Sequence, residues 1–163
     1  MTSLFGVYPF FDYGFTYPRN VFKTCPDRTR GFLKNSLMDV LAREFPDFAF
    51  LISTAKMESL FNDPNFYGTL LVPPTIPNVV SYDLYTARMI VKTHLLMGRI
   101  RREDILTSPV QQLQTSVKGI MLFTESFPNG NIRFQKQTYL LPGSKECVNG
   151  LIHPIQSLIV VVT

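Results

Sequence analysis

The C-terminal segment of residues 149–162 constrains the fold more than any other part of the chain. It opens with Asn149-Gly150 and continues as an almost uninterrupted apolar run that contains one histidine. Asn-Gly is typical of a tight turn, because glycine adopts the positive φ that such turns require. We therefore expect a turn at this dipeptide, a strand over residues 151–155 and a second, fully buried strand over residues 158–162.

Helix signals lie in the first half of the chain. Ser36 followed by Asp39 is a variant of the capping box and predicts a helix that starts at this point. Pro46 opens a second helix, which is apolar nearly all round over residues 48–55, so we expect it to be buried. A short third helix is expected over residues 57–61.

The clearest helix is predicted over residues 81–97. Its apolar stripe includes His94 near the C-terminal end, and Gly98 follows in the position of a helix cap. Residues 99–104 are expected to form a solvated turn ahead of a short helical or irregular piece.

The remaining elements are predicted to be strands. Residues 66–72 form the first, which ends at Pro73 because proline cannot donate to a β-ladder. Residues 128–131 carry a strong hairpin signal. The flanking strands are expected over residues 119–125, 132–136 and 138–141. Helices come mostly first and strands mostly follow, which indicates an α+β fold.

Residues 1–34 differ from the rest of the chain, which we expect to form one domain over residues 35–163. Glycines and prolines separate the aromatic residues of this segment and exclude a helical period. We expect an extended arm that either folds over its own core or docks on a neighbouring subunit, and the sequence leaves both open. The aromatic anchors are Phe5, Tyr8, Phe10, Phe11, Tyr13, Phe15 and Tyr17.

Composition and charge favour a globular domain. The chain is 45% hydrophobic and 17% charged, which argues against disorder. The formal net charge is +4, a field too weak to indicate nucleic-acid binding. No apolar run approaches the ~20 residues of a membrane-spanning helix.

Cysteine usage and the sequence's ends bear on the compartment. Cys25 and Cys147 are too few for a disulfide framework. The chain shows no basic start typical of a signal peptide and no Asn-x-Ser/Thr sequence. We therefore expect two free thiols in an intracellular protein, with a secreted or surface location as the alternative.

Catalytic motifs are missing from the sequence. It contains no glycine-rich phosphate loop, no Gly-x-Ser-x-Gly and no His-Glu-x-x-His. His94 and His153 are expected to be structural, and Cys25 or Cys147 paired with a histidine, as in a hydrolase, is a remote alternative. The basic residues within residues 99–104 are followed at once by acidic ones, which is typical of a solvated face. We expect no catalytic residue, cofactor or metal ion.

Three segments, in order, resemble the boxes of the fasciclin-like domain family. Residues 69–74 (TLLVPP) resemble Thr-x-Phe-Ala-Pro-Thr, residues 93–98 (THLLMG) a Tyr-His motif followed by Gly, and residues 149–156 (NGLIHPIQ) Asn-Gly-x-Ile-His-x-Ile-Asp. The resemblance implies a fasciclin-like domain, with N-terminal helices packed on a C-terminal β-wedge of mainly antiparallel sheets. The positions that it marks as structural are Thr69, Pro73, His94, Gly98, Asn149, Gly150 and His153.

The chain departs from the family's pattern within each box. Thr93 stands for the Tyr, Gln156 for the Asp and Pro74 for the Thr. In extracellular members of the family the Tyr-His and last-box regions are associated with integrin binding and cell adhesion. The loss of Tyr and Asp therefore argues against integrin binding by this chain.

The resemblance also bears on function, because the family as a whole is not enzymatic. We expect a non-enzymatic protein-interaction module that binds other protein subunits through the arm and the domain surface. The form we expect is a structural component of a larger assembly, such as a minor capsid or virion protein of a large DNA virus. An extracellular cell-adhesion module of the fasciclin type is the alternative.

Overall fold

The structure, a computed structural model, describes residues 31–160. The chain divides into two compact units, Met1–Phe32 and Leu33–Thr163, and almost all described residues belong to the second. The aromatic anchors of the arm and Cys25 lie outside the described residues. The expectations about the arm, and the boundary between residues 34 and 35, therefore stay predictions.

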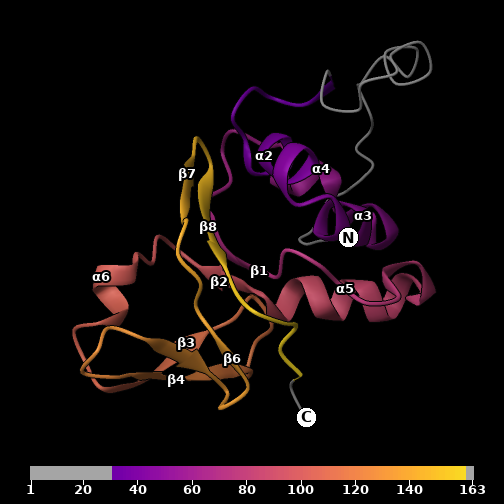
Figure 1. Cartoon of the computed structure of the whole chain (residues 1–163). Helices are drawn as coiled ribbons and strands as arrows, with labels where there is room; N and C mark the ends of the chain where they lie inside the picture. The colour runs from indigo at the N-terminus through magenta and orange to yellow at the C-terminus, as the bar shows by residue number, and fades with distance from the viewer. Residues whose placement is uncertain (1–30, 161–163) are drawn as a thin grey trace. The chain divides into compact units, whose positions relative to one another are not determined.

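Short helices form the N-terminal part of the second unit (Figure 1). α2 (Leu37–Glu44) begins as predicted, because the Ser36 hydroxyl accepts a hydrogen bond from the Asp39 backbone N–H at 3.1 Å. α3 (Pro46–Ala55) starts with its proline, and α4 (Glu58–Phe61) follows. The burial predicted for α3 holds on most of its surface, but Phe50 is 41% exposed.

A mixed sheet with the strand order β2-β1-β8-β7 forms the centre of this unit. β1 (Gly68–Val72) and β8 (Gly150–Pro154) pair in parallel, and every residue of both is buried. β2 (Leu95–Met97) and β7 (Lys145–Cys147) are the edge strands and run antiparallel to their neighbours. Burial on both faces explains why β1 and β8 are mostly apolar and do not alternate between apolar and polar residues.

The second sheet is an antiparallel meander with the order β3-β4-β5-β6. It consists of β3 (Val110–Gln114), β4 (Met121–Ser126), β5 (Ile132–Phe134) and β6 (Thr138–Tyr139). The predicted hairpin at residues 128–131 joins β4 to β5, with Gly130 at φ +89°.

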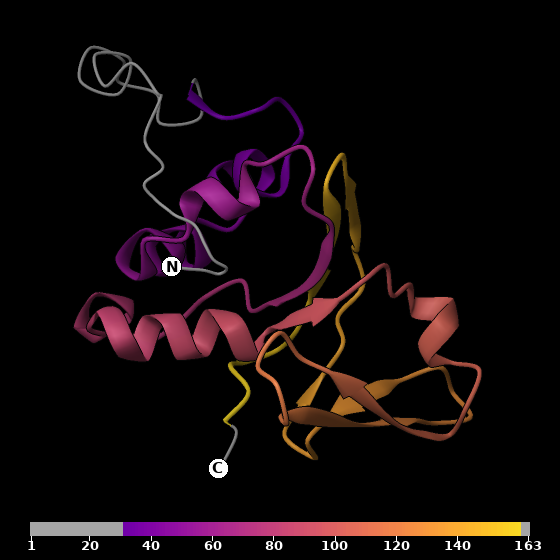
Figure 2. The same ribbon diagram turned by 180° about the vertical axis from the view of Figure 1, so that it is seen from behind.

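The helices and the second sheet cover opposite sides of the mixed sheet. Figures 1 and 2 show α2, α3, α4 and α5 (Leu84–Thr93) on one side, and the meander with α6 (Arg102–Ile105) on the other. A buried apolar cluster between the sheets includes Leu71, Leu96, Leu122 and Phe134. The predicted α+β class is confirmed.

The predicted helix over residues 81–97 is too long at both ends. α5 starts after Asp83, whose carboxylate accepts from the Thr86 N–H at 2.8 Å, and it ends at Thr93. Residues 95–97 form β2, because pairing with β1 buries Leu95 and Leu96 in the core. Gly98 therefore caps no helix; at φ +86° it turns the chain after a strand.

The C-terminal prediction needs two corrections. Residues 158–160 form no strand, and of these only Ile159 is buried. The strand at residues 151–155 is confirmed as β8, but Asn149 and Gly150 do not adopt positive φ. Gly150 instead starts β8, where it pairs with Cys147 across the hairpin.

Candidate functional site

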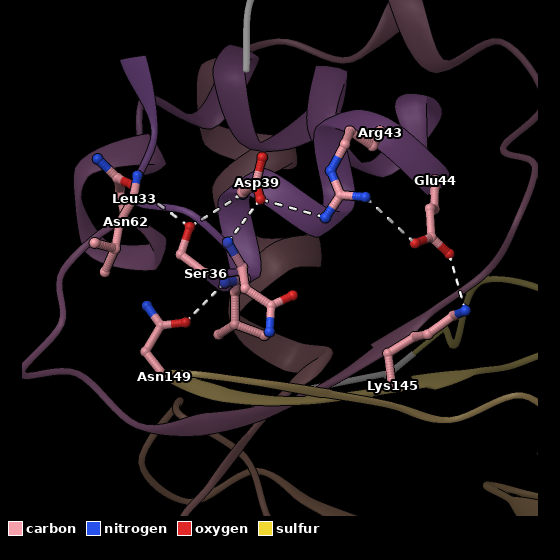
Figure 3. Close-up of polar contacts among 10 residues, drawn as sticks. Leu33, Ser36, Asp39, Arg43, Glu44, Asn62, Lys145 and Asn149 are labelled. Carbon is pink, nitrogen blue, oxygen red and sulfur yellow. Dashed lines mark hydrogen bonds and ion pairs between the residues drawn. The ribbon is translucent and has the colours of Figure 1, made fainter. Parts of the chain in front are cut away.

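Asn149 ties the start of β8 to the N-terminal helices (Figure 3). Its side-chain oxygen accepts from the Leu37 N–H at 2.7 Å, at the first turn of α2. Its amide nitrogen donates to the carbonyls of Phe61 at 2.8 Å and Asp63 at 3.0 Å, at the end of α4. Asn149 is fully buried, so this single side chain satisfies helix-terminal groups that water does not reach.

A second group of polar contacts runs along α2 to the surface. The Asp39 carboxylate accepts from the Asn35 N–H at 2.7 Å and pairs with Arg43 at 3.3 Å. Glu44 pairs with Lys145 of β7 at 3.1 Å, as Figure 3 shows. The outer pair is half exposed and contributes little stability, so the buried end of this group holds the helix.

Gly150 is required by close packing. A Cβ at this position would lie 2.3 Å from the Gly68 carbonyl oxygen and 2.7 Å from Leu37 Cδ1. The Asn-Gly pair of the last box therefore has two roles. Asn149 holds the helices by hydrogen bonds, and Gly150, which has no Cβ, lets β1 approach β8.

His94 is a buried structural clasp at the end of α5. Its Nε2 accepts from the Ile159 N–H at 2.9 Å, so its Nδ1 carries the proton and donates to the Ile90 carbonyl at 2.7 Å. Burial lowers the pKa of His94 to about 4, against the opposing effect of the Ile90 carbonyl. The ring is therefore neutral at pH 7 and holds the C-terminal segment on the core.

Thr69, Gly98 and His153 meet around the backbone of Ile100. The Thr69 hydroxyl donates to the Gly98 carbonyl at 2.8 Å and accepts from the Ile100 N–H at 3.0 Å. His153 Nε2 donates to the Ile100 carbonyl at 2.7 Å, and its Nδ1 accepts from the Ser144 hydroxyl at 2.6 Å. One residue from each of the three boxes thus joins a single hydrogen-bonded chain through Ile100.

An open cavity of about 610 Å³ lies beside His153. The loop that carries Ser144 forms part of its wall, as do side chains near α6. Its charged lining residues are Arg101, Arg102, Glu103, Lys145 and Glu146. Burial lowers the pKa of His153; the Ile100 carbonyl opposes this and Arg102 adds to it.

The other positions of the boxes are structural or exposed. Pro73 is buried where β1 ends. Thr93 is buried and its hydroxyl donates to the Ile90 carbonyl at 3.0 Å. Pro74 and Gln156, which replace the family's Thr and Asp, lie at the surface.

The structure does not support a cysteine nucleophile at Cys147. Burial raises the pKa of this thiol to about 11, and the Glu44 carboxylate adds to the rise. Both ring nitrogens of His94 and of His153 are bonded to other groups. Cys147 is a free thiol that the structure pairs with neither histidine.

One exposed apolar face was missed by sequence reasoning. Tyr85 is 76% exposed and Met89 49%, one turn apart on α5. Val80 of the preceding 3₁₀ turn η2 (Val79–Ser81) is 75% exposed. We call Tyr85 and Met89 the α5 face; its sequence signal is the spacing of four between two apolar residues on the polar side of a helix.

Two further site classes find no support among residues 31–160. No group of three His, Cys, Asp or Glu side chains there is placed to hold a metal ion. Within the same residues, the helices are all too short or too polar to cross a bilayer.

Comparison with solved structures finds a similar fold in a FAS1 domain pair from the insect cell adhesion molecule fasciclin I. The TM-score is 0.61 at 17% identity, over 80% of this chain and 52% of that chain. The chain thus spans about half the length of the structure that it matches. This likeness confirms the fasciclin-like fold that the boxes predict.

Comparisons by sequence add no relative. No model of a protein family matches the chain, and no curated protein matches it. The fold therefore stands on the structural likeness and on the boxes.

Proposed function

We propose that this chain is a protein-interaction module, and that it assembles with other copies through the α5 face and the N-terminal aromatic arm. The observation that carries the proposal is the exposure of Tyr85 and Met89 on one side of a helix whose opposite side is buried. An apolar face that a folded domain leaves in water is typical of a binding surface.

The contacts of the polar residues in the boxes explain why these residues are not the binding surface. Asn149, His94 and His153 are buried, and each forms hydrogen bonds to backbone groups within the domain. Tyr85 and Met89 do not contribute to the core, because the buried side of α5 includes Ala87 and Val91 instead. Aromatic residues and methionine are enriched at protein interfaces, which agrees with a binding role for this face.

The specific form of the proposal is a structural subunit of an intracellular assembly, such as a minor capsid or virion protein of a large DNA virus. It is supported by the aromatic arm, by the free buried thiol of Cys147 and by the lack of glycosylation sequences. The test is detection of the chain in purified particles at a fixed ratio to the major subunit. Its presence only in the unassembled fraction would contradict this form.

Sedimentation velocity of the full chain tests the assembly itself. Tyr85→Lys with Met89→Lys should weaken self-association by about 100-fold or more, because each buried apolar side chain contributes about 1.5–3 kcal/mol. The control pair Val110→Lys with Met121→Lys alters exposed apolar residues on β3 and β4 and should leave association unchanged. A wild-type chain that stays monomeric at all concentrations would refute the proposal.

Cell adhesion is the second candidate, because the similar domain pair belongs to a cell adhesion molecule. Its test is attachment of cells to a surface coated with the purified chain. Attachment that is lost in the Tyr85→Lys and Met89→Lys variant would favour adhesion through the same face. Attachment no greater than to an albumin coat would exclude it.

A further inference from the structure

The contact between Ser144 and His153 has the geometry of a nucleophile and its base. The Ser144 hydroxyl oxygen lies 2.6 Å from His153 Nδ1. Ser144 is exposed in the loop before β7, whereas His153 is 2% exposed within β8. An accessible hydroxyl is thus bonded to an imidazole that the sheet holds in place.

The tautomer of His153 is fixed by its other nitrogen. The Ile100 carbonyl lies 2.7 Å from Nε2 and can only accept, so Nε2 carries the proton of the neutral ring. Nδ1 therefore presents its lone pair to Ser144, and the serine O–H donates to it. The arrangement of hydroxyl, base and an orienting third group is the one that activates serine nucleophiles.

Burial keeps the base neutral, and the cavity beside it leaves room for a substrate. Burial holds the pKa of His153 below its usual value and Arg102 adds to this, while the Ile100 carbonyl and Glu103 oppose it. The ring is thus neutral at pH 7. Ser144 and His153 both line the cavity of about 610 Å³, and so do Arg101 and Arg102. The Arg102 guanidinium also donates to the Gly130 carbonyl at 2.6 Å. Cationic side chains that line a site can stabilise a developing oxyanion.

We infer that Ser144 is a nucleophile, with His153 as its general base, and that it accepts an acyl group from a small carboxylic ester bound in this cavity. Ser144 Oγ attacks the ester carbonyl carbon while its proton moves to Nδ1. The bond from the acyl carbon to the leaving alkoxide breaks, and the alkoxide takes that proton and leaves as an alcohol. Water then attacks the acyl carbon and passes a proton to Nδ1. The bond from the acyl carbon to Ser144 Oγ breaks, Oγ takes that proton, and the carboxylic acid leaves. This inference departs from the sequence-based expectation of a non-enzymatic module, and it is independent of the proposed assembly.

p-Nitrophenyl acetate tests the inference on the full chain. We expect release of p-nitrophenolate and an acetyl group on Ser144, located by mass spectrometry of peptides. Ser144→Ala should slow the release by about 100-fold or more, the lower end of what general-base assistance contributes. The matched control is Ser157→Ala, which removes an exposed hydroxyl that makes no hydrogen bond among residues 31–160.

The pH profile separates a base from a merely structural histidine. The rate should fall as the pH is lowered, with its midpoint below 6.5, because protonated His153 cannot accept the serine proton. His153→Gln should lose the low-pH limb while circular dichroism shows whether the variant is folded. Acetylation spread over lysines, or an unchanged rate in Ser144→Ala, would overturn the inference.

Discussion

Replacing Asn149 with alanine tests whether the last box acts as a latch between β8 and the helices. The substitution removes three hydrogen bonds at once: buried ones to the Leu37 N–H and the Phe61 carbonyl, and a partly buried one to the Asp63 carbonyl. It does not alter the backbone of the hairpin, because Asn149 does not adopt positive φ.

The expected loss follows from these contacts. Each hydrogen bond contributes about 1 kcal/mol net, and groups left unsatisfied in the interior cost about 1–3 kcal/mol each. Water entering the space left by the side chain relieves part of the second cost. We therefore expect the Asn149→Ala variant to lose about 3–5 kcal/mol, a large share of the ~5–15 kcal/mol that stabilises a typical domain.

Urea denaturation followed by circular dichroism measures this loss. The control is Asn129→Ala, which removes an exposed side chain that accepts one hydrogen bond, from the Asn131 N–H at 3.0 Å. The control should lose no more than about 1 kcal/mol. If Asn149→Ala is no less stable than Asn129→Ala, the latch does not hold the helices and the reasoning is wrong.

Three further predictions concern glycine, histidine and cysteine positions. Gly150→Ala should cost about 3 kcal/mol or more because its Cβ meets a β1 carbonyl, whereas Gly98→Ala, with open space at φ +86°, should cost about 1 kcal/mol of strain in urea denaturation. The free energy of unfolding should fall by up to ~3 kcal/mol between pH 6.5 and about 4, because His94 binds a proton in the unfolded chain but not in the folded one. His94→Gln should reduce this dependence of stability on pH, and an unchanged dependence would contradict the prediction. Peptide mapping after iodoacetamide treatment should show Cys147 alkylated at least about tenfold faster in urea than in the native chain, and equal rates would contradict its burial.

Local signals in the sequence predicted most of the helices. The signals at Ser36, at Pro46 and at the hairpin of residues 128–131 depend only on neighbouring residues. Their structural effect can therefore be predicted without knowing the fold. The boxes predicted the fold class, and both histidines of the boxes have buried rings whose nitrogens are all hydrogen-bonded.

The errors lie where distant partners decide the structure. Residues 95–97 continue the helical pattern of α5, but they form a strand because β1, more than 20 residues earlier in the chain, pairs with them. β3 was missed because only one of its residues, Leu113, is buried, so it shows no apolar alternation. The tautomers of the two histidines depend on Ile100 and Ile159, which are 53 and 65 residues away.

The candidate site was the least predictable part. Ser144 carries no motif, and only the hairpin of β7 and β8 brings its hydroxyl to His153. The α5 face was equally hidden, because exposure is a property of the packed domain. Two exposed apolar residues on a helix become informative only once its buried side is known.

Hydrogen–deuterium exchange at low and high protein concentration tests the central claim most directly. The claim is that the boxes hold the fold while the α5 face binds. We predict that raising the concentration slows exchange in peptides covering η2 and α5, residues 79–93, and leaves β7 and β8 unchanged. Protection that appears in β7 and β8 instead, or in no part of residues 31–160, would contradict the account.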